Sequence, residues 1–258
     1  MIISAKTDIG LKRSTNQDSF SYGQIENGNV TWAVVCDGMG GMAGGATASR
    51  LALDTFAQSM REHILPDNPE DEPDLGSIGL RFALSASASD ANRAVYREAK
   101  ESDGKFEDMG TTLVALLVVE NTLAYSLNIG DSRMYDISDG KITQLTKDHS
   151  YVQQLVDMGQ ITYEEAKTSP MRNIITRAVG IDGDVVADIH SLSPAPGFPD
   201  APRYILLCSD GLCGVISDEE IADIVCSDGE LRDKTERLVT AANNAGGPDN
   251  ITVVIAEL

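Results

Sequence analysis

The sequence is short of basic residues. Lysine and arginine together number 20, against 40 aspartates and glutamates, and the formal net charge is −20 at pH 7. Nucleic acids and anionic membrane surfaces are bound through basic patches, so this balance argues against both kinds of partner. The acidic excess leaves two interpretations open. It can simply keep the chain soluble, or it can supply clustered carboxylates that collect divalent cations.

Long apolar segments are also missing. No run approaches the roughly 20 apolar residues that a transmembrane helix needs, and residues 1–6 lack the pattern of a signal peptide. The four cysteines, Cys36, Cys208, Cys213 and Cys226, lie mostly in apolar runs and match no zinc-binding spacing. We therefore expect a cytoplasmic protein without a membrane segment, whose cysteines are reduced.

The pattern of apolar residues predicts one domain over residues 1–258, since no repeat or linker divides the chain. Helical spacing predicts helices over residues 46–64, 77–100, 218–225 and 231–245. Short apolar runs predict strands over residues 1–9, 19–25, 112–119, 123–129, 133–137, 142–145, 185–189, 204–208 and 251–256. Runs of strands and runs of helices, without strict alternation, indicate an α+β fold with largely antiparallel sheets.

The connections carry signals of their own. Residues 66–74 and 193–202 are rich in proline, and residues 120–121 suit a hairpin turn. We expect the strands between residues 112 and 145 to form one antiparallel meander. Residues 149–166 then form a small helical excursion, in which Thr162 and Glu165 have the spacing of a capping box.

The most distinctive stretch is Val30–Gly41. An apolar run of strand length ends on Asp37, and Gly38, Gly40 and Gly41 follow within four residues. Glycines let the backbone turn sharply and approach a ligand without a Cβ in the way. A carboxylate at the end of a buried strand, beside such a backbone, suits a metal or phosphate site.

Four further aspartates stand at strand ends or turns. Asp210 follows an apolar strand and precedes glycine, Asp249 precedes the last strand, Asp131 lies in a turn, and Asp18 begins a strand. Each alone is more often part of an ordinary turn. Together they favour a functional site, because an unpaired charge at the end of a buried strand is costly.

Carboxylates that converge in this way must bind cations or shift their pKa values. Oxygen ligands without histidine or cysteine select Mg²⁺ or Mn²⁺. Two such ions about 4 Å apart can activate a bridging hydroxide and hold a phosphoryl oxygen. Arg13, in a loop near Asp18, can grip phosphate with its planar guanidinium. Metal-assisted hydrolysis of a phosphoester is the hypothesis that the residues support.

Eight short motifs follow one another along the chain: Arg13–Asp18, Val35–Gly41, Met109–Thr112, Asn128–Arg133, Thr146–Ser150, Asn173–Gly180, Cys208–Leu212 and Asp249–Thr252. In this order and spacing they resemble the metal-dependent protein phosphatases, the type 2C Ser/Thr family, in its bacterial branch. The resemblance implies a four-layer αββα sandwich of two antiparallel sheets flanked by helices. It also implies hydrolysis of phosphoserine or phosphothreonine in proteins, by a hydroxide that bridges two metal ions.

The resemblance assigns the core ligands of two Mn²⁺ or Mg²⁺ ions. Asp37 bridges both ions, and the Gly38 carbonyl binds the second of them. Asp210 and Asp249 complete the shell of the first ion.

Further roles follow from the same resemblance. Asp18 acts on the second ion through water, Asp131 with Asp210 serves a weaker third ion, Arg13 binds the phosphoryl group, and Asn250 supports the ligands from behind. Residues 150–179 match the flap, a subdomain beside the active site that influences substrate choice. The implied partners are phosphorylated proteins, the targets of a bacterial Ser/Thr kinase, and the implied state is a monomer.

The chain departs from the family where relatives carry a histidine. Met39 and Met42 stand at two such places, and Ser169-Pro170 replaces a His-Pro pair in the flap. Protonation of the leaving alkoxide by a histidine is therefore in doubt, and water on the third ion is our hypothesis for it. His149 is either a catalytic acid or an anchor for the turn into the flap. An impaired, phosphoprotein-binding module of the same fold is the alternative function, but the retained aspartates favour the enzyme.

Overall fold

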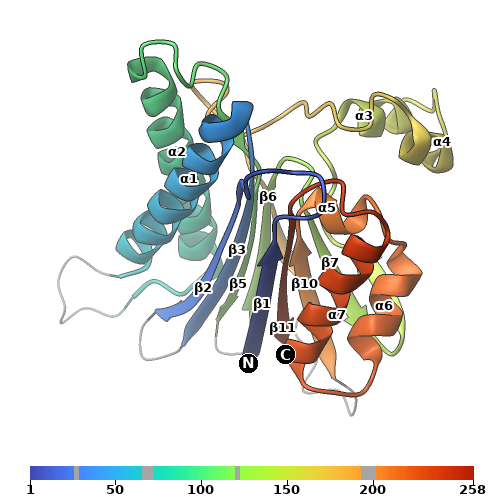
Figure 1. Ribbon diagram of the computed structural model, residues 1–258. Coiled ribbons are helices and arrows are strands. Elements are labelled where there is room, and N and C mark those ends of the chain that lie inside the picture. The colour runs from blue at the N-terminus through green and yellow to red at the C-terminus, as the bar shows by residue number, and fades with distance from the viewer. Residues whose placement is uncertain (26–28, 66–72, 120–122, 193–201) are drawn as a thin grey trace.

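Two antiparallel sheets stacked face to face form the centre of the molecule (Figure 1). The computed structural model describes residues 1–25, 29–65, 73–119, 123–192 and 202–258, without the side chain of Met42. The connections predicted at residues 120–121, and nearly all of those at 66–74 and 193–202, lie outside the described residues.

The first sheet has the strand order β1-β11-β10-β7-β8. Its strands are β1 (Ile2–Asp8), β11 (Ile251–Glu257), β10 (Arg203–Cys208), β7 (Arg133–Ser138) and β8 (Lys141–Gln144). The second sheet has the order β2-β3-β5-β6-β9, and β4 pairs with β3. Its strands are β2 (Asp18–Ile25), β3 (Val30–Met39), β5 (Leu113–Val119), β6 (Leu123–Ile129), β9 (Asp188–Leu192) and β4 (Gly110–Thr111).

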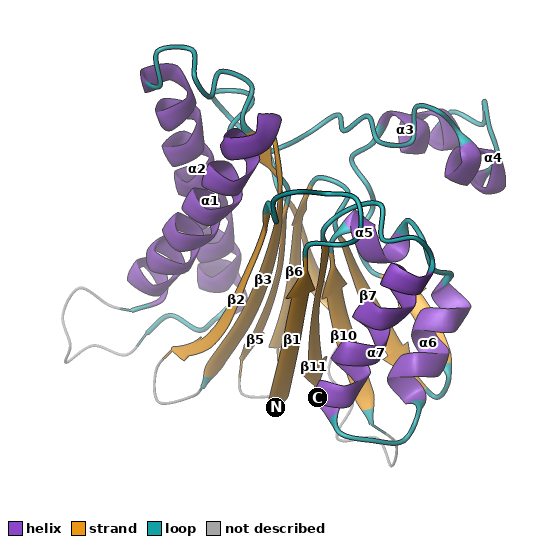
Figure 2. Cartoon of the chain, viewed as in Figure 1, coloured by secondary structure: helices purple, strands orange, loops and turns teal. Residues whose placement is uncertain are grey.

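Helices cover the outer face of each sheet, and two more stand apart (Figure 2). The second sheet is covered by α1 (Gly41–Ile64) and α2 (Ser77–Glu101). The first sheet is covered by α5 (Asp210–Cys213), α6 (Asp218–Cys226) and α7 (Leu231–Asn244). The excursion holds α3 (Tyr151–Asp157) and α4 (Tyr163–Thr168), and α4 begins with the predicted Thr162–Glu165 capping box. The predicted αββα sandwich is confirmed.

Three apolar clusters fill the spaces between the four layers. On β3, Val34 and Cys36 face α1 and α2, whereas Val35 packs between the sheets against strands that include β10 and β11. A strand buried on both faces needs apolar residues at every position, not at every second one. The unbroken apolar run before Asp37 therefore reflects the position of β3 inside the sandwich.

The meander predicted between residues 112 and 145 is wrong in one respect. β5 and β6 belong to the second sheet, but β7 and β8 belong to the first. The chain changes sheets in the turn at residues 130–132, where Gly130 has a φ of 107°. A run of strands with short turns reads the same whether the chain stays in one sheet or crosses over. Asp131 therefore lies at a corner between the two sheets.

Two predicted boundaries are also corrected. The last strand of the second sheet is Asp188–Leu192, not 185–189; it is an edge strand that pairs with β6 alone, so its pattern is weak. The first helix begins at Gly41, not at residue 46. Gly44 and Gly45 disfavour a helix by propensity, but close packing requires glycine at position 45, because a Cβ there would lie 2.7 Å from the Gly38 carbonyl oxygen on β3. No helix in the described parts of the chain is both long and apolar enough to cross a membrane.

Gly38 should be the position most sensitive to an added methyl group. A Cβ there would lie 2.1 Å from the Gly45 carbonyl oxygen and 2.7 Å from that of Gln17. We expect Gly38→Ala to lower the free energy of unfolding by roughly 1–3 kcal/mol, because backbone atoms must move apart. Urea unfolding in EDTA measures this without any contribution from metal. The control is Gly183→Ala, whose Cβ would approach nothing closer than 4.0 Å; equal stability of the two variants would contradict the expectation.

Candidate metal centre

The five predicted aspartates gather at one end of the sandwich. Asp18 and Asp37 are direct partners in the β2–β3 pairing. Asp210 is the first residue of α5, directly beyond β10, and Asp249 lies two residues before β11. Figure 1 shows the loop between β1 and β2 (blue) passing beside α5 at this end. Both sheets thus direct carboxylates to the edge that they share.

A cavity of 460 Å³ opens at this edge. Its lining includes the side chains of Asp37, Asp131, Asp210 and Asp249, and also Arg13 and Gly38. Asp18 is not in the lining but lies behind it, and its Oδ1 is buried with no hydrogen-bond partner of ordinary geometry. The structure therefore brings every predicted site residue to one cavity or to the layer directly behind it.

Two threonines hold the backbone of Asp37 in place. The amide of Asp37 donates to Thr112 Oγ1 (2.9 Å), and its carbonyl accepts from the amide of Thr112 (2.9 Å) and from Thr111 Oγ1 (2.8 Å). Both threonines are buried. The motif Met109–Thr112 carried no role in the sequence analysis, and these contacts give it one: it fixes the strand end that presents Asp37.

Asn250 organises the loop that carries Arg13. Its Oδ1 accepts from the amide of Gln17 (2.8 Å), and its Nδ2 donates to the carbonyls of Ile9 (2.9 Å) and Thr15 (3.1 Å). One buried side chain thus ties down both ends of the loop. Asn250 thus supports the site in two ways: its side chain holds the loop of Arg13, and its backbone amide donates to Asp249 Oδ1 (2.8 Å).

Arg13 is the one basic residue in the described lining of the cavity. Its Nη2 lies 2.6 Å from Asp249 Oδ2, and about half of its side chain is exposed (51%). This hydrogen bond raises the pKa of Arg13, with the charges of Asp249, Asp37 and Asp210 adding to the effect. A single guanidinium neutralises at most one of the carboxylates.

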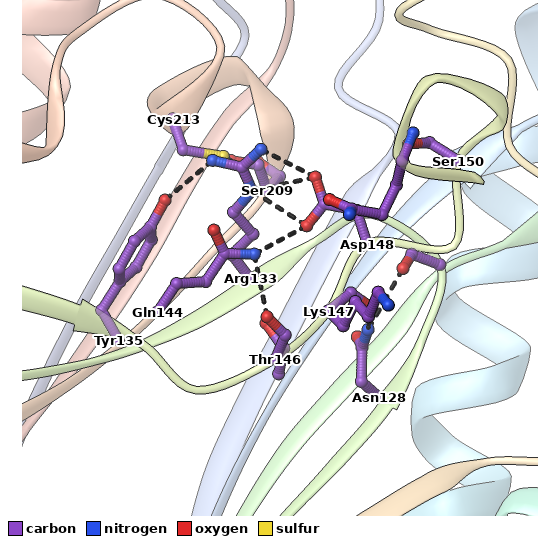
Figure 3. Close-up of polar contacts among 12 residues, drawn as sticks. Asn128, Arg133, Tyr135, Gln144, Thr146, Lys147, Asp148, Ser150, Ser209 and Cys213 are labelled. Atoms are coloured by element: carbon purple, nitrogen blue, oxygen red, sulfur yellow. Dashed lines mark hydrogen bonds and ion pairs between the residues drawn. The ribbon is translucent and has the colours of Figure 1, made fainter. Parts of the chain in front are cut away.

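Arg133, the other cation near the aspartates in sequence, has a different partner (Figure 3). Its Nε donates to Asp148 Oδ1 (3.0 Å) and its Nη2 to Asp148 Oδ2 (2.7 Å), while Nη1 donates to the Tyr135 hydroxyl (3.0 Å). The pair lines a second cavity of 310 Å³, which also includes Asp131 and Asp210. In the described structure Arg133 therefore forms its ion pair with Asp148 and not with Asp131, although its charge still favours the ionised form of Asp131.

His149 acts as an anchor. Its Nδ1 accepts from the amide of Gly130 (3.0 Å), and its Nε2 lies 3.1 Å from Asp188 Oδ2 and 2.9 Å from Arg177 Nη1. The ring is buried and is not in the described lining of the metal-site cavity. These contacts favour the anchor over the catalytic acid, because both ring nitrogens are already engaged.

Burial and like charge raise the pKa of the clustered carboxyls. Burial raises the pKa of Asp37 well above its usual range, and the charge of Asp18 raises it further. The pKa values of Asp131 and Asp210 are raised for the same reasons, burial first and neighbouring aspartates second. Burial raises the pKa of Asp18 to about 6, although the Thr252 and Ser209 hydroxyls counteract it. The ionised cluster therefore needs added positive charge.

The residues fit divalent cations. The available donors are carboxylate and carbonyl oxygens, which suit Mg²⁺ and Mn²⁺, and the buried Oδ1 of Asp18 lacks a partner. Among the described residues, no three His, Cys, Asp or Glu side chains form a group tight enough to hold an ion by themselves. Like-charged carboxylates repel one another, so we expect an ion to draw them closer.

Known proteins resemble this chain over nearly its whole length. A sequence model of the protein phosphatase 2C family matches residues 12–243. A putative protein phosphatase 2C-type from Streptococcus pyogenes is 39% identical over 255 residues, which cover 99% of this chain and 96% of that protein.

Two solved structures are also similar. The Ser/Thr phosphatase Stp1 from Staphylococcus aureus has a TM-score of 0.87 at 33% identity, with 99% of this chain and 94% of that chain covered. The catalytic domain of the Ser/Thr protein phosphatase PstP, solved with two manganese ions, has a TM-score of 0.77 at 34% identity, with 98% and 96% covered.

The metal-free protein should lose stability as the pH rises through the pKa of its buried carboxyls. Folding raises the pKa of Asp18 from 3.8 to about 6, so the folded chain keeps a proton that the unfolded chain has released. Ionising this group alone costs the folded state roughly 3 kcal/mol. Urea unfolding in EDTA between about pH 4 and pH 7 should show the decline, with a smaller one in Asp18→Asn. Stability that stays level or rises in both proteins would contradict the burial of an unneutralised cluster.

Proposed function

Since the chain belongs to the metal-dependent protein phosphatase 2C family and is a Ser/Thr protein phosphatase, we propose that the 460 Å³ cavity is its active site. Two divalent ions, Mn²⁺ or Mg²⁺, are held there by Asp37, the Gly38 carbonyl, Asp210 and Asp249. Asp18 acts on the second ion from behind, and Asp131 with Asp210 serves a weaker third ion. PstP, a similar protein, was solved with two manganese ions, which supports this assignment.

One observation carries the proposal. Five carboxylates from separate strand ends and turns converge on one edge of the sandwich, four of them in the lining of one cavity that contains a single basic side chain. Burial and mutual repulsion raise the pKa of Asp37, Asp131 and Asp210. Such a cluster destabilises the folded protein unless cations neutralise it, so its presence indicates a cation-binding function.

When bound, the ions would lower the pKa of a water molecule and would stabilise the negative charge of the phosphoryl oxygens. The chain's own residues do the rest. Asp37 and its partner threonines fix the position of the ligands relative to the cavity. Arg13 binds the phosphoryl group through its planar guanidinium, and its neighbour in the structure, Asp249, holds it at the cavity mouth until the substrate arrives. Asn250 holds both ends of the loop that carries Arg13 and so fixes the position of this loop.

The substrates are phosphorylated proteins, and we propose that they are the targets of a bacterial Ser/Thr kinase. Residues 150–179 form a flap beside the cavity, and Asn173 and Ile175 from this segment contribute to its lining. The single domain, the monomeric state and the cytoplasmic location remain predictions. The alternative, an impaired phosphoprotein-binding module, is less well supported, because all five predicted aspartates are present in the sequence and the similar proteins carry the names of phosphatases.

Removal of the bridging carboxylate should abolish catalysis. We expect Asp37→Ala to lower kcat for an aryl phosphate by about 10³-fold or more, because several kcal/mol of charge stabilisation depend on the ions that Asp37 holds. The assay compares wild type and variant over a Mn²⁺ titration and in EDTA. Asp54→Ala, which removes an exposed carboxylate on α1, is the control and should retain full activity. Activity of the wild type in EDTA equal to that in Mn²⁺ would refute metal-assisted hydrolysis.

The rate of hydrolysis should depend strongly on the leaving group, because no histidine among the described residues of the cavity is available to protonate it. Met39 lines the cavity, and no histidine is present in its described lining. Alkyl leaving groups need a proton more than aryl leaving groups do, so we expect wild type to hydrolyse aryl phosphate much faster than phosphoserine peptide. Met39→His should raise the ratio of phosphoserine to aryl-phosphate turnover, whereas Met39→Gln, similar in size but not an acid, should not. An unchanged ratio in Met39→His would show that protonation of the leaving group does not limit the rate.

A further inference from the structure

Ser209 forms a hydrogen bond with Asp18, one of the predicted metal-site aspartates. It is fully buried between β10 and α5, and its Oγ lies 2.8 Å from Asp18 Oδ2. Asp18 opens β2 of the second sheet, whereas Ser209 follows β10 of the first. This hydrogen bond therefore joins the two sheets across the sandwich, next to the carboxylates. The family resemblance gave Ser209 no role.

The proton of Ser209 has one favourable direction. The backbone amide of Thr252 donates to Ser209 Oγ at 3.0 Å, so the serine oxygen is an acceptor on that side. Its single proton is then available to the carboxylate oxygen of Asp18 at 2.8 Å, since the competing carbonyl of Asn250 lies at the limit of 3.5 Å. A hydroxyl whose acceptor side is fixed by a backbone amide cannot turn away from its carboxylate.

A second hydroxyl is ordered toward the same carboxylate. Asn16 Nδ2 donates to Thr7 Oγ1 at 2.8 Å, and Thr7 Oγ1 lies 2.7 Å from Thr252 Oγ1. When Thr7 donates to Thr252, the Thr252 proton is left for Asp18. The Thr252 hydroxyl indeed interacts with the Asp18 carboxylate and lowers its pKa. The first sheet thus places two hydroxyl groups near one aspartate of the second, and the Ser209 hydroxyl hydrogen-bonds to it.

The hydrogen bond from Ser209 engages only one of the two carboxylate oxygens of Asp18. Asp18 Oδ2 accepts from Ser209, while Oδ1 is buried and has no hydrogen-bond partner of ordinary geometry. A carboxylate that is held on one oxygen by a buried donor presents its other oxygen in a restricted direction. Such an arrangement costs stability unless a cation, or water on a cation, takes up the free oxygen.

We propose that Ser209, assisted by Thr252, is a positioning residue that orients Asp18 toward the second metal ion. The inference rests on the proposed two-ion site and deepens it. Ser209 touches neither substrate nor reacting atoms in this account; it acts through Asp18 alone. Removal of the Ser209 hydroxyl should therefore lower the affinity for one ion and leave the affinity for the other unchanged.

The test is calorimetric titration of the metal-free, full-length protein with MnCl₂, which reads ion affinity without turnover. We expect wild type to bind two ions in the main phase, and Ser209→Ala to bind one of them about tenfold or more weakly, the usual scale for loss of a group behind a ligand. Thr252→Val, which keeps the shape and the backbone amide, should weaken the same step. The control is Ser126→Ala, because Ser126 is equally buried but its Oγ has no hydrogen-bond partner in the described structure.

The outcomes separate this inference from the proposed function. If wild type binds two ions and both Ser209→Ala and Thr252→Val bind them with unchanged affinity, the positioning role is wrong while the metal site stands. An equal loss of affinity for both ions would also overturn it, and so would the same loss in Ser126→Ala. A general destabilisation of the fold has that effect. If wild type binds no Mn²⁺, the proposed function itself fails. Should Ser209→Ala not fold, Thr252→Val decides the question.

Discussion

The structure depends on one electrostatic constraint: several buried carboxylates meet at the common edge of two sheets with too little positive charge nearby. Among the described residues, Arg13 forms its ion pair with Asp249 and Arg133 forms its ion pair with Asp148. Burial and mutual repulsion therefore raise the pKa of the remaining aspartates. The strands that carry these residues pack in three apolar clusters. The stability gained from this packing offsets the repulsion between the aspartates. Divalent cations are the natural complement of such an edge.

The αββα architecture provides the ligands because strands of both sheets end at the same place. Asp18 and Asp37 come from neighbouring strands of the second sheet, and Asp210 comes from the end of a strand in the first. Asp131 lies at the corner where the chain passes from one sheet to the other. Local contacts fix two of them: the threonines behind Asp37 and the Ser209 hydroxyl behind Asp18. A rigid frame thus assembles a site that no single element could build.

The aspartates that stand at strand ends could be predicted from the sequence, because an apolar run followed by Asp-Gly is visible in one segment of chain. The layered fold came from the resemblance of motifs and not from periodicity, which had merged β5, β6, β7 and β8 into one meander. Sheet membership depends on partners that are distant in sequence, so a local pattern cannot reveal it. The start of α1 was missed because glycine propensity argues against a helix, whereas close packing against Gly38 demands glycine. Ser209 was missed because its partner, Asp18, is 191 residues away.

The most direct test of the account is a diffraction measurement on crystals of the protein grown with Mn²⁺, using the anomalous signal of manganese to locate the ions. The account predicts two strong peaks about 4 Å apart, with Asp37 between them, Asp210 and Asp249 beside one, and the Gly38 carbonyl beside the other. Carboxylates that remain apart, with no manganese peak in the 460 Å³ cavity, would contradict it.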